Sequence, residues 1–441
     1  MGFCMATDKV LYKLTNAQRQ VVDPMFVLPK KSGEQAELSV YFEVKSNADI
    51  NALERAFNYL IQDNDGLRVR IILTLQGMRQ YIADYDYETI PVFDVASEEE
   101  KLQIIREHRA LGHGVFNDKL YHALIIRNGD AAMLYMTLQH SIFDGYSINL
   151  WLKSIKEYYE CCINNEEPHI GEKKYCYEKY IQYDTKLREN KKIKANNKYF
   201  ANLLNKTKAY NVVVPIKKGY APSAHREFAF DDNEYQIIKS AAEKIGVPVS
   251  GYVSSVIALV FSINSKVNHL ALTHLSHGRM TAAQRQTIGS MTQLVLSPYH
   301  VNGDELFAEY VANSFSAYLE GLKHLESDVI SILVRAIPRE LLTMRVNHWG
   351  FLLSFMNYGD ETLDKDKYEF GTVPWTHQAN QYYCTVSDNG TDKLRFSIDY
   401  QTKVIREERL DQIMDMLKRA MVVCAKHSDY TVRQLCSDLE N

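Results

Sequence analysis

The chain has little proline and glycine, no excess of either charge and no long apolar run. Its 441 residues include 10 prolines and 20 glycines, which is neither a collagen-like nor a linker-rich composition, so we expect almost every stretch to fold. The formal net charge of -4 removes the usual reason to propose a nucleic-acid partner or a polybasic membrane-surface protein. The longest apolar segment, Val253 to Ile263, is far shorter than the ~20 residues that span a bilayer. We therefore expect no nucleic acid and no membrane among its partners.

The cysteines do not build a disulfide framework. Their number, seven, is odd, and no two of them form a CxxC pair. This favours reduced thiols in a cytosol over a secreted disulfide scaffold. The first ten residues contain charged side chains and lack the apolar core of a signal peptide. The sequence therefore predicts a cytoplasmic protein.

The common catalytic signatures are also missing. No GxxxxGK[ST], GxGxxG, HExxH or GxSxG pattern is present, so phosphate-cradling loops, dinucleotide sites, zinc peptidase sites and nucleophile elbows are unsupported. His269, His274 and His277 are close in sequence, but no carboxylate or cysteine joins them in a ligand pattern. We expect no metal.

The pattern of apolar residues predicts an α/β protein of two lobes. A length of 441 residues suggests two or three folded units, and strand-like and helix-like segments alternate without a flexible linker or a repeat. The polar segment 175–202 lacks glycine and proline and predicts one long, partly exposed helix near the lobe boundary, which we place after residue 178. The lobes are then 1–178 and 179–441.

Individual elements can be predicted within each lobe. In the first lobe we expect strands at 38–44, 67–75, 122–127 and 133–140, and helices at 50–61, 98–111 and 147–159. In the second lobe we expect helices at 232–244, 250–264, 305–323 and 406–424, a strand at 267–275, and a hairpin of strands 382–387 and 394–400 around Asn389 and Gly390.

The most informative segment is Gln139-His140-Ser141-Ile142-Phe143-Asp144-Gly145. It joins the carboxyl end of an apolar strand to a capped helix, which is where α/β folds place ligand groups. His140 is expected at the strand tip, Asp144 can pair with a cation, and Gly145 suits a turn that needs positive φ or a close backbone approach. The alternative is a satisfied core histidine at 140 and a simple helix cap at 144. The residues alone leave both interpretations open.

This segment resembles the HHxxxDG signature of the condensation domains of nonribosomal peptide synthetases, in the superfamily of chloramphenicol acetyltransferase-like acyltransferases. Further segments resemble other elements of the family in the family's order, and they lie at Leu14 to Arg19, Asp63 to Arg70, Gly114 to Asn117, Ser276 to Arg279, Ile288 to Gly289, His324 to Val334, Asn347 to Asn357 and Leu394 to Tyr400. The resemblance therefore covers nearly the whole chain.

The resemblance implies a fold and a reaction. The fold would be two chloramphenicol acetyltransferase-like α/β lobes in a V-shaped pseudo-dimer with a central tunnel. The reaction would join a thioester-bound acyl or aminoacyl group to an amine, or to a hydroxyl, with His140 in the catalytic role. Asp144 and Arg279 would form the pair that holds the signature turn, and the Gly145 N–H would be an oxyanion or positioning donor. Gln293 and Asn357 would line the substrate tunnel.

The resemblance also implies the partners. No cofactor would be bound permanently, because the acyl donor is a thioester on the phosphopantetheine arm of a carrier protein or on coenzyme A. No adenylation or carrier segment is evident, so we expect a freestanding module whose donor arrives in trans. The sequence departs from the family at Gln139, where the first signature histidine is expected, and at Gln293, where an asparagine is expected.

Three other interpretations are weighed against this one. An epimerization domain would carry a motif similar to E-G-H-G-R-E in the second lobe, but here Leu275 stands where the first acid would be, which argues against it. A coenzyme A-dependent O- or N-acyltransferase of the same superfamily stays open, since sequence does not separate amine from hydroxyl acceptors. The third is a non-catalytic condensation-like module that recruits a partner, which Gln139 and Gln293 favour and the retained His140 opposes.

Overall fold

A computed structural model describes most of the chain. The described residues are 9–27, 37–112, 114–116, 119–171, 175–206, 221–325, 327, 351–356, 363–374, 377–378, 382–388, 394–403 and 405–440. Asn389 and Gly390, expected at a turn, lie outside them.

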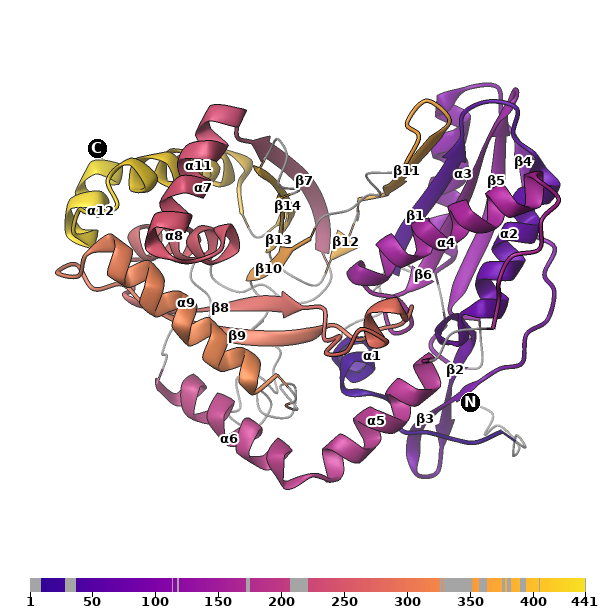
Figure 1. The fold of residues 1–441 in the computed structure, drawn as a ribbon, viewed down its shortest axis with the longest axis horizontal. Coiled ribbons are helices and arrows are strands. Elements are labelled where there is room, and N and C mark those ends of the chain that lie inside the picture. The colour runs from indigo at the N-terminus through magenta and orange to yellow at the C-terminus, as the bar shows by residue number, and fades with distance from the viewer. Residues whose placement is uncertain are drawn as a thin grey trace. The chain divides into compact units, whose positions relative to one another are not determined.

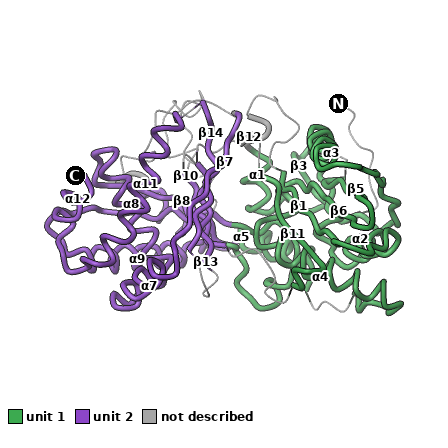
Figure 2. Tube along the Cα trace, turned by 90° about the horizontal axis from the view of Figure 1, so that it is seen from above, with its two compact units in different colours: residues 1–189, 277–292, 358–375 green, residues 190–276, 293–357, 376–441 purple. Residues whose placement is uncertain are grey.

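The chain divides into two compact units, coloured separately in Figure 2. Unit 1 contains residues 1–189, 277–292 and 358–375, and unit 2 contains residues 190–276, 293–357 and 376–441. The boundary expected after residue 178 differs from this division, because two later segments return to unit 1. One of them, 277–292, bonds to the signature turn, and the other supplies an edge strand to the unit 1 sheet.

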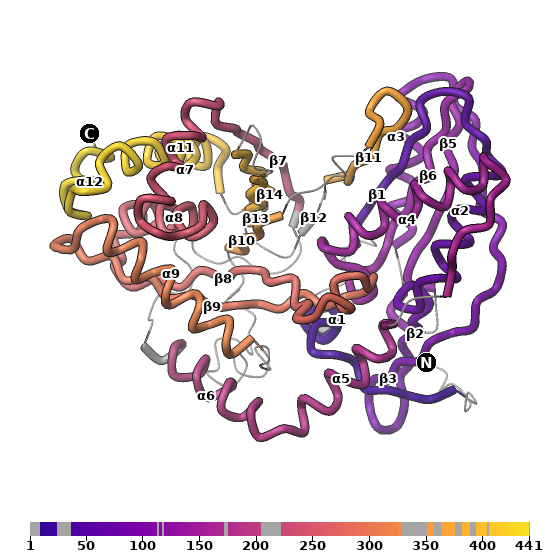
Figure 3. Tube along the Cα trace, viewed as in Figure 1, coloured from indigo at the N-terminus to yellow at the C-terminus, as the bar shows by residue number. Residues whose placement is uncertain are grey.

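Unit 1 is built on a five-stranded sheet in the order β11-β1-β6-β5-β4. Its strands are β1 (Glu37–Val44), β4 (Val92–Asp94), β5 (Tyr121–Asn128), β6 (Ala131–Gln139) and β11 (Tyr368–Thr372). Figure 3 shows β11, in orange, beside the indigo β1, with Phe42 opposite Phe370 in antiparallel register. A separate hairpin pairs β2 (Val69–Thr74) with β3 (Gly77–Ile82). Backbone pairing across more than 300 residues thus ties the late segment to unit 1.

Helices cover both faces of this sheet, as Figure 1 shows. They are α2 (Ile50–Asp63) and α4 (Gly145–Ile163) on one face and α3 (Glu98–Leu111) on the other, and unit 1 also contains α1 (Asn16–Val27) and α5 (Tyr177–Glu189). Alternation along β6 decides which face is which. Leu134 and Met136 join the main core with Phe57 of α2 and Trp151 of α4, whereas Tyr135 joins a smaller cluster under α3. Both faces of β6 are therefore packed against apolar clusters, and this holds the strand whose end carries the signature turn.

Unit 2 contains a seven-stranded sheet in the order β12-β7-β14-β13-β10-β8-β9. Its strands are β7 (Ala221–Ala229), β8 (His269–Ser276), β9 (Gln293–His300), β10 (Phe351–Phe355), β12 (His377–Gln378), β13 (Tyr382–Asp388) and β14 (Leu394–Gln401). Its helices are α6 (Lys191–Lys206), α7 (Asp232–Ile245), α8 (Val249–Ser265), α9 (Phe307–Lys323), α11 (Glu407–Lys426) and α12 (Val432–Glu440). The antiparallel β13–β14 pair confirms the predicted hairpin.

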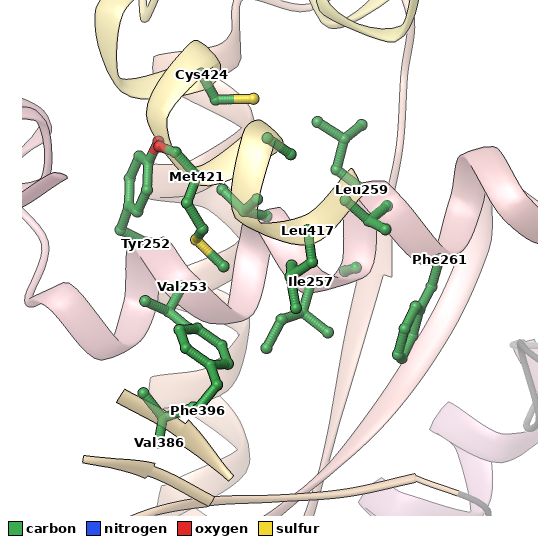
Figure 4. Close-up of a cluster of buried hydrophobic side chains, with 14 of the residues drawn as sticks. Tyr252, Val253, Ile257, Leu259, Phe261, Val386, Phe396, Leu417, Met421 and Cys424 are labelled. Carbon is green, nitrogen blue, oxygen red and sulfur yellow. The ribbon is translucent and has the colours of Figure 1, made fainter. Parts of the chain in front are cut away.

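The core of unit 2 lies where α8 and α11 pack over the sheet. Figure 4 shows Val253 of α8 beside Phe396 of β14, with Leu417 and Met421 on α11. Residues 251–262 of α8 are all buried, so the longest apolar segment of the sequence is a core helix. Within the described residues no single helix has the length and apolar character to cross a membrane, and α7 with α8 meets that test only as a pair bent by 99°. Both units are mixed α/β, as predicted.

The expectation of one long helix over 175–202 is wrong. Two helices, α5 and α6, replace it, and Asn190 lies between them. The Asn190 side chain accepts a hydrogen bond of 3.0 Å from the backbone N–H of Lys192, as a residue at a helix start does. The same point is the boundary between the two units. Asparagine often starts a helix, so Asn190 was a local sign of a break. The prediction of one helix relied instead on the absence of glycine and proline from the segment.

Candidate functional site

The signature turn joins β6 to α4. Gln139 is the last residue of β6, and the backbone turns back at once, with Ile142 N–H donating to the Gln139 carbonyl at 3.0 Å. Asp144 then caps α4, with extended backbone angles and a side chain that accepts from the Ser147 N–H. This helix begins at Gly145, two residues earlier than predicted, because Asp144 is the cap.

His140 follows β6 directly and is half-buried, and its Nδ1 is enclosed by protein. Burial lowers the pKa of the His140 imidazole below its usual value, although its own carbonyl, the Asp144 carboxylate and the Phe143 carbonyl act in the opposite direction. The ring is therefore uncharged at neutral pH. A neutral imidazole has one nitrogen lone pair that can accept a proton. His140 is thus in the protonation state that a general base requires.

The Asp144 carboxylate is fully buried and accepts hydrogen bonds at both oxygens. Its Oδ1 accepts from the N–H and the hydroxyl of Ser147, at 3.0 and 2.8 Å. Its Oδ2 accepts from the backbone N–H groups of Met291 and Thr292, at 2.9 and 3.1 Å. Burial by itself would raise the pKa of Asp144, but the Arg279 guanidinium and these donors outweigh burial and hold that pKa below its usual range.

Arg279 forms a two-point ion pair with Asp144. Its Nη1 lies 2.9 Å from Oδ2 and its Nη2 lies 3.1 Å from Oδ1, and neither side chain is exposed. The remaining guanidinium hydrogens reach the carbonyl oxygens of His277, Thr287 and Gly289, at 3.0, 3.1 and 2.9 Å. Buried charges require partners on every side, and here they are met by the opposite charge and by backbone carbonyls. The pair predicted from the family resemblance is present in the structure.

Two glycines allow segment 277–292 to approach the rest of unit 1. A Cβ atom on Gly289 would lie 2.2 Å from the Tyr177 ring, and one on Gly66 would lie 2.4 Å from the Ile288 carbonyl oxygen. The buried Tyr177 hydroxyl donates to the Ser290 carbonyl at 2.9 Å. Only a hydrogen fits at either glycine, which explains why the sequence has glycine in both elements.

Gln139 is completely buried at the end of β6. Its side-chain Oε1 accepts hydrogen bonds from the Ser141 hydroxyl and, at 3.2 Å, from the Ser141 backbone N–H. The backbone N–H of Gln139 donates to the Leu120 carbonyl at 2.8 Å. The side chain therefore closes the turn from inside. Gln139 occupies the position of the first signature histidine as a buried hydrogen-bonding group that supports the turn.

Of the two reasons considered for a glycine at 145, a positive φ does not apply. Gly145 is the first residue of α4, and it is not among the described residues with positive φ. The glycine of this site that does adopt the left-handed region is Gly278, with a φ of 66°. The N–H of Gly145 is one of the N-terminal helix donors that have no acceptor within the helix. Its suggested donor role therefore stays a prediction.

Of the two tunnel candidates, only Gln293 is among the described residues. Gln293 is the first residue of β9 in unit 2, where it is 8% exposed and stands opposite Ser276. Asn357 lies outside the described residues. Their roles remain predictions.

Sequence reasoning missed several groups that hold the turn. Ser147 was expected only as a helix start, yet its hydroxyl also accepts from the Gly289 N–H at 3.1 Å and from Arg279 Nη2 at 3.0 Å. The position of Ser147, three residues after the cap Asp144, was a sign in the sequence that its side chain could bond to that carboxylate. The N–H groups of Met291 and Thr292 gave none, because every residue except proline carries a backbone donor.

The three histidines considered as metal ligands have separate partners. The His269 ring stacks on His300 with centroids 4.1 Å apart, and His274 lies 3.0 Å from the Tyr299 hydroxyl. Burial lowers the pKa of His274 to about 3. His277 Nδ1 accepts from the Arg279 N–H at 3.0 Å. The described residues contain no group of three His, Cys, Asp or Glu side chains that could hold a metal ion.

A family model for the condensation domain matches residues 9–441, which include the signature turn and the arginine that holds it. The chain belongs to the condensation-domain family. Condensation domains form amide bonds by acyl transfer, so the chain is classed with the amide-forming acyltransferases. The predicted family is therefore confirmed.

The curated relatives include subunits of plipastatin synthase and of surfactin synthase. One subunit of plipastatin synthase from Bacillus subtilis (strain 168) is 22% identical over 439 residues, which cover 96% of this chain and 17% of the relative. Surfactin synthase subunit 1 of the same organism is 22% identical over 450 residues, with 96% and 12% covered. The chain thus spans less than a fifth of the length of either relative.

Solved structures share the fold over the full length. The first condensation domain of the calcium-dependent antibiotic synthetase, in complex with a substrate analogue, has a TM-score of 0.81 at 15% identity, with 97% of this chain and 99% of that chain covered. The starter condensation domain of rhizomide synthetase in complex with C8-CoA has a TM-score of 0.80 at 15% identity, with 96% and 97% covered. The X-domain from teicoplanin biosynthesis, in its complex with OxyB, has a TM-score of 0.81 at 16% identity, with 99% and 98% covered.

Proposed function

We propose that the chain transfers an acyl or aminoacyl group from a thioester to an amine and forms an amide. The observation that carries this proposal is the neutral His140, held at the end of β6 beside the fully buried Asp144–Arg279 pair. The ion pair fixes the turn from which His140 projects. A base presented on a rigid turn needs no reorganisation when the substrates arrive.

In the proposed reaction the amine nitrogen attacks the thioester carbonyl carbon, and the carbonyl π electrons move to the oxygen. His140 accepts a proton from the attacking nitrogen. The tetrahedral intermediate collapses, the C–S bond breaks, and the thiolate takes the proton from the imidazolium. The products are one amide and one free thiol, and His140 returns to its neutral form.

Positioning is expected to contribute more than proton transfer. A general base typically contributes ~10² to 10⁴ in rate, whereas orienting two reactants can remove roughly 7 to 11 kcal/mol of the barrier. A thioester is already an activated acyl group, so less help is needed from the base. Loss of His140 should therefore reduce turnover strongly without abolishing it.

The donor is proposed to be a thioester carried by phosphopantetheine on a carrier protein or by coenzyme A. The C8-CoA complex of the rhizomide starter domain supports the second form, since that domain shares this fold. An amine acceptor is preferred over a hydroxyl on the basis of family membership. The reaction is placed in the cytoplasm, which agrees with six free cysteines among the described residues.

A second candidate function is recruitment of a partner protein without chemistry. The match to the X-domain in its complex with OxyB favours it, as does Gln139 at the first signature position. The retained His140, Asp144 and Arg279 favour catalysis. The two functions differ in whether an acyl group moves.

The test supplies the purified chain with acetyl-CoA, octanoyl-CoA and aminoacyl thioesters of N-acetylcysteamine, each with amino acid and aliphatic amine acceptors. Intact-mass measurement of the products should find an amide that forms faster than in the protein-free mixture. His140→Ala should slow its formation ~10² to 10⁴-fold. Equal rates with and without protein across the panel, together with tight binding of a partner protein, would support the recruiter instead.

A further inference from the structure

His277 is an exposed residue that Arg279 contacts twice, once at the imidazole and once at the backbone carbonyl. The backbone N–H of Arg279 donates to His277 Nδ1 at 3.0 Å, and Arg279 Nη1 donates to the His277 carbonyl at 3.0 Å. Gly278 between them adopts a φ of 66°, which lets the chain fold back so that both contacts form. Neither the signature motif nor the proposed mechanism uses this imidazole.

The hydrogen bond to Nδ1 settles the tautomer. Because Nδ1 accepts a hydrogen bond, the single proton of the neutral ring is on Nε2. Partial desolvation of the ring, together with the positive charges of Arg279 and Arg285, lowers the pKa of His277, so the ring is neutral at pH 7. No hydrogen bond to Nε2 is found within the described residues. His277 therefore presents a fixed, uncharged N–H donor to its surroundings.

His277 and His140 are attached to the same ion pair. Asp144 belongs to the same turn as His140 and is bonded to Arg279, and Arg279 in turn donates its backbone N–H to His277. Tyr146 links the two sides. Its ring lies 5.0 Å from the His277 ring and 4.6 Å from the guanidinium carbon of Arg279, and it is the second residue of the helix that Asp144 caps. The segment that carries the base and the segment that carries the donor are thus locked together.

We propose that His277 Nε2–H donates a hydrogen bond to the thioester carbonyl oxygen of the substrate on which His140 acts. This inference rests on the proposed function. When the amine attacks, negative charge develops on that oxygen, and a fixed neutral donor stabilises it without taking up a proton. The donor remains protonated throughout, so His140 alone handles the proton that moves from the amine to the leaving thiolate. A neutral imidazole is suited to this task because its N–H stays in place as the charge grows.

A purely structural role for His277 would depend on Nδ1, and the proposed role depends on Nε2. The two are separable by amide substitutions. In His277→Asn the side-chain oxygen occupies the Nδ1 position and keeps the bond from the Arg279 N–H, but no donor reaches the Nε2 position. In His277→Gln the amide N–H can reach the Nε2 position, and the Nδ1 acceptor is lost. His269→Asn, at an exposed position on β8, is the control for a histidine outside the site.

The experiment measures kcat and KM for amide formation from octanoyl-CoA or aminoacyl N-acetylcysteamine thioesters, and the thermal midpoint of each variant. The inference predicts that His277→Asn lowers kcat ~10² to 10³-fold with little change in KM, the loss typical of one missing oxyanion donor. His277→Gln should recover most of that rate, and His269→Asn should match the wild type. All should unfold near the wild-type midpoint.

The outcomes distinguish this inference from the function beneath it. An active wild type whose His277→Asn variant keeps its kcat would overturn the donor role and leave the proposed function intact. The donor role is equally overturned if His277→Asn is active and stable while His277→Gln is inactive and unfolds early, because the acceptor at Nδ1 would then be what matters. A wild type with no turnover on any thioester of the panel overturns both proposals together.

Discussion

Arg279 and Asp144 are joined by two parallel hydrogen bonds, of 2.9 and 3.1 Å, with both side chains fully buried. The two residues are 135 positions apart in the sequence, and each carries an element that the other needs. Asp144 caps α4 and ends the turn that begins at His140, while Arg279 donates hydrogen bonds to backbone carbonyls of segment 277–292. One ion pair therefore organises the whole site.

Removal of either partner should destabilise unit 1 strongly. Arg279→Met leaves the Asp144 carboxylate buried without its opposite charge, and the free energy of unfolding should fall by about 3 to 5 kcal/mol. The double variant Asp144→Asn with Arg279→Met should be more stable than Arg279→Met alone, because no net charge stays buried. Denaturant titration compares these two variants with the wild type. The control is Arg127→Met, which breaks the exposed pair with Asp94 and should change the midpoint little. Equal losses at the two arginines would contradict the assignment.

The close approach at Gly289 should make it intolerant of any side chain. Gly289→Ala places a methyl group 2.2 Å from the Tyr177 ring and should lower the free energy of unfolding by ~1 to 3 kcal/mol. Gly303→Ala is the matched control, since its nearest neighbour is the flexible side chain of Arg433 at 3.3 Å. Denaturant midpoints compare the two. The packing argument fails if both alanines cost the same.

The rate of amide formation should follow the protonation of His140. Its pKa is held below the usual value of 6.5 by burial, and only the neutral ring accepts a proton. The rising limb of kcat/KM against pH should therefore have its midpoint below 6.5, with a plateau at neutral pH. In His140→Ala the limb should vanish along with most of the rate. A midpoint well above the usual histidine value would show that another group limits the reaction.

His225 should make stability decrease at alkaline pH. Its Nδ1 lies 2.9 Å from Asp399 and its Nε2 lies 3.0 Å from Glu227, and these carboxylates, opposed by burial, raise the pKa of His225 to about 9. Because the folded-state pKa exceeds the unfolded value of 6.5, the stabilisation is complete below 6.5 and disappears as the pH rises through about 9. After allowance for solvent screening we expect about 1 to 2 kcal/mol.

The check for His225 is urea denaturation across that pH window. The wild type should lose stability between pH 6.5 and about 9, and His225→Gln, which cannot take up the proton, should show a flatter profile. Parallel profiles for the two proteins would rule out a contribution from this cluster.

Gln139 should matter for the stability of the turn. Gln139→Leu removes the acceptor of the buried Ser141 hydroxyl and N–H, which should cost about 1 to 3 kcal/mol. Gln139→His offers a ring nitrogen as a replacement acceptor and should cost less. Thermal midpoints rank the two variants, and amide formation should depend on His140 in both. Reversal of the ranking would mean that the pocket is shaped for an amide alone.

Local patterns predicted much of the fold. The apolar alternation of β6 and the helical spacing of α2 are decided by which residues can face a core, and both elements were predicted within two residues of their ends. Strands β9 and β11 were not predicted. Pro298 interrupts the apolar run of β9, and β11 is a short edge strand whose partner β1 lies more than 300 residues earlier. Pairing at that distance leaves no signal in the local sequence of β11.

By itself, the sequence determined the family, the position of His140 at a strand end and the identity of the two charged residues beside it. These depend on short spacings and on residue chemistry, which a linear pattern retains. Only the tertiary structure decided what stabilises them: the backbone N–H groups of Met291 and Thr292, the hydroxyl of Ser147, and the fixed imidazole of His277. Backbone donors are identical at nearly every residue, so their use depends on where the chain returns in space. That return is set by long-range packing.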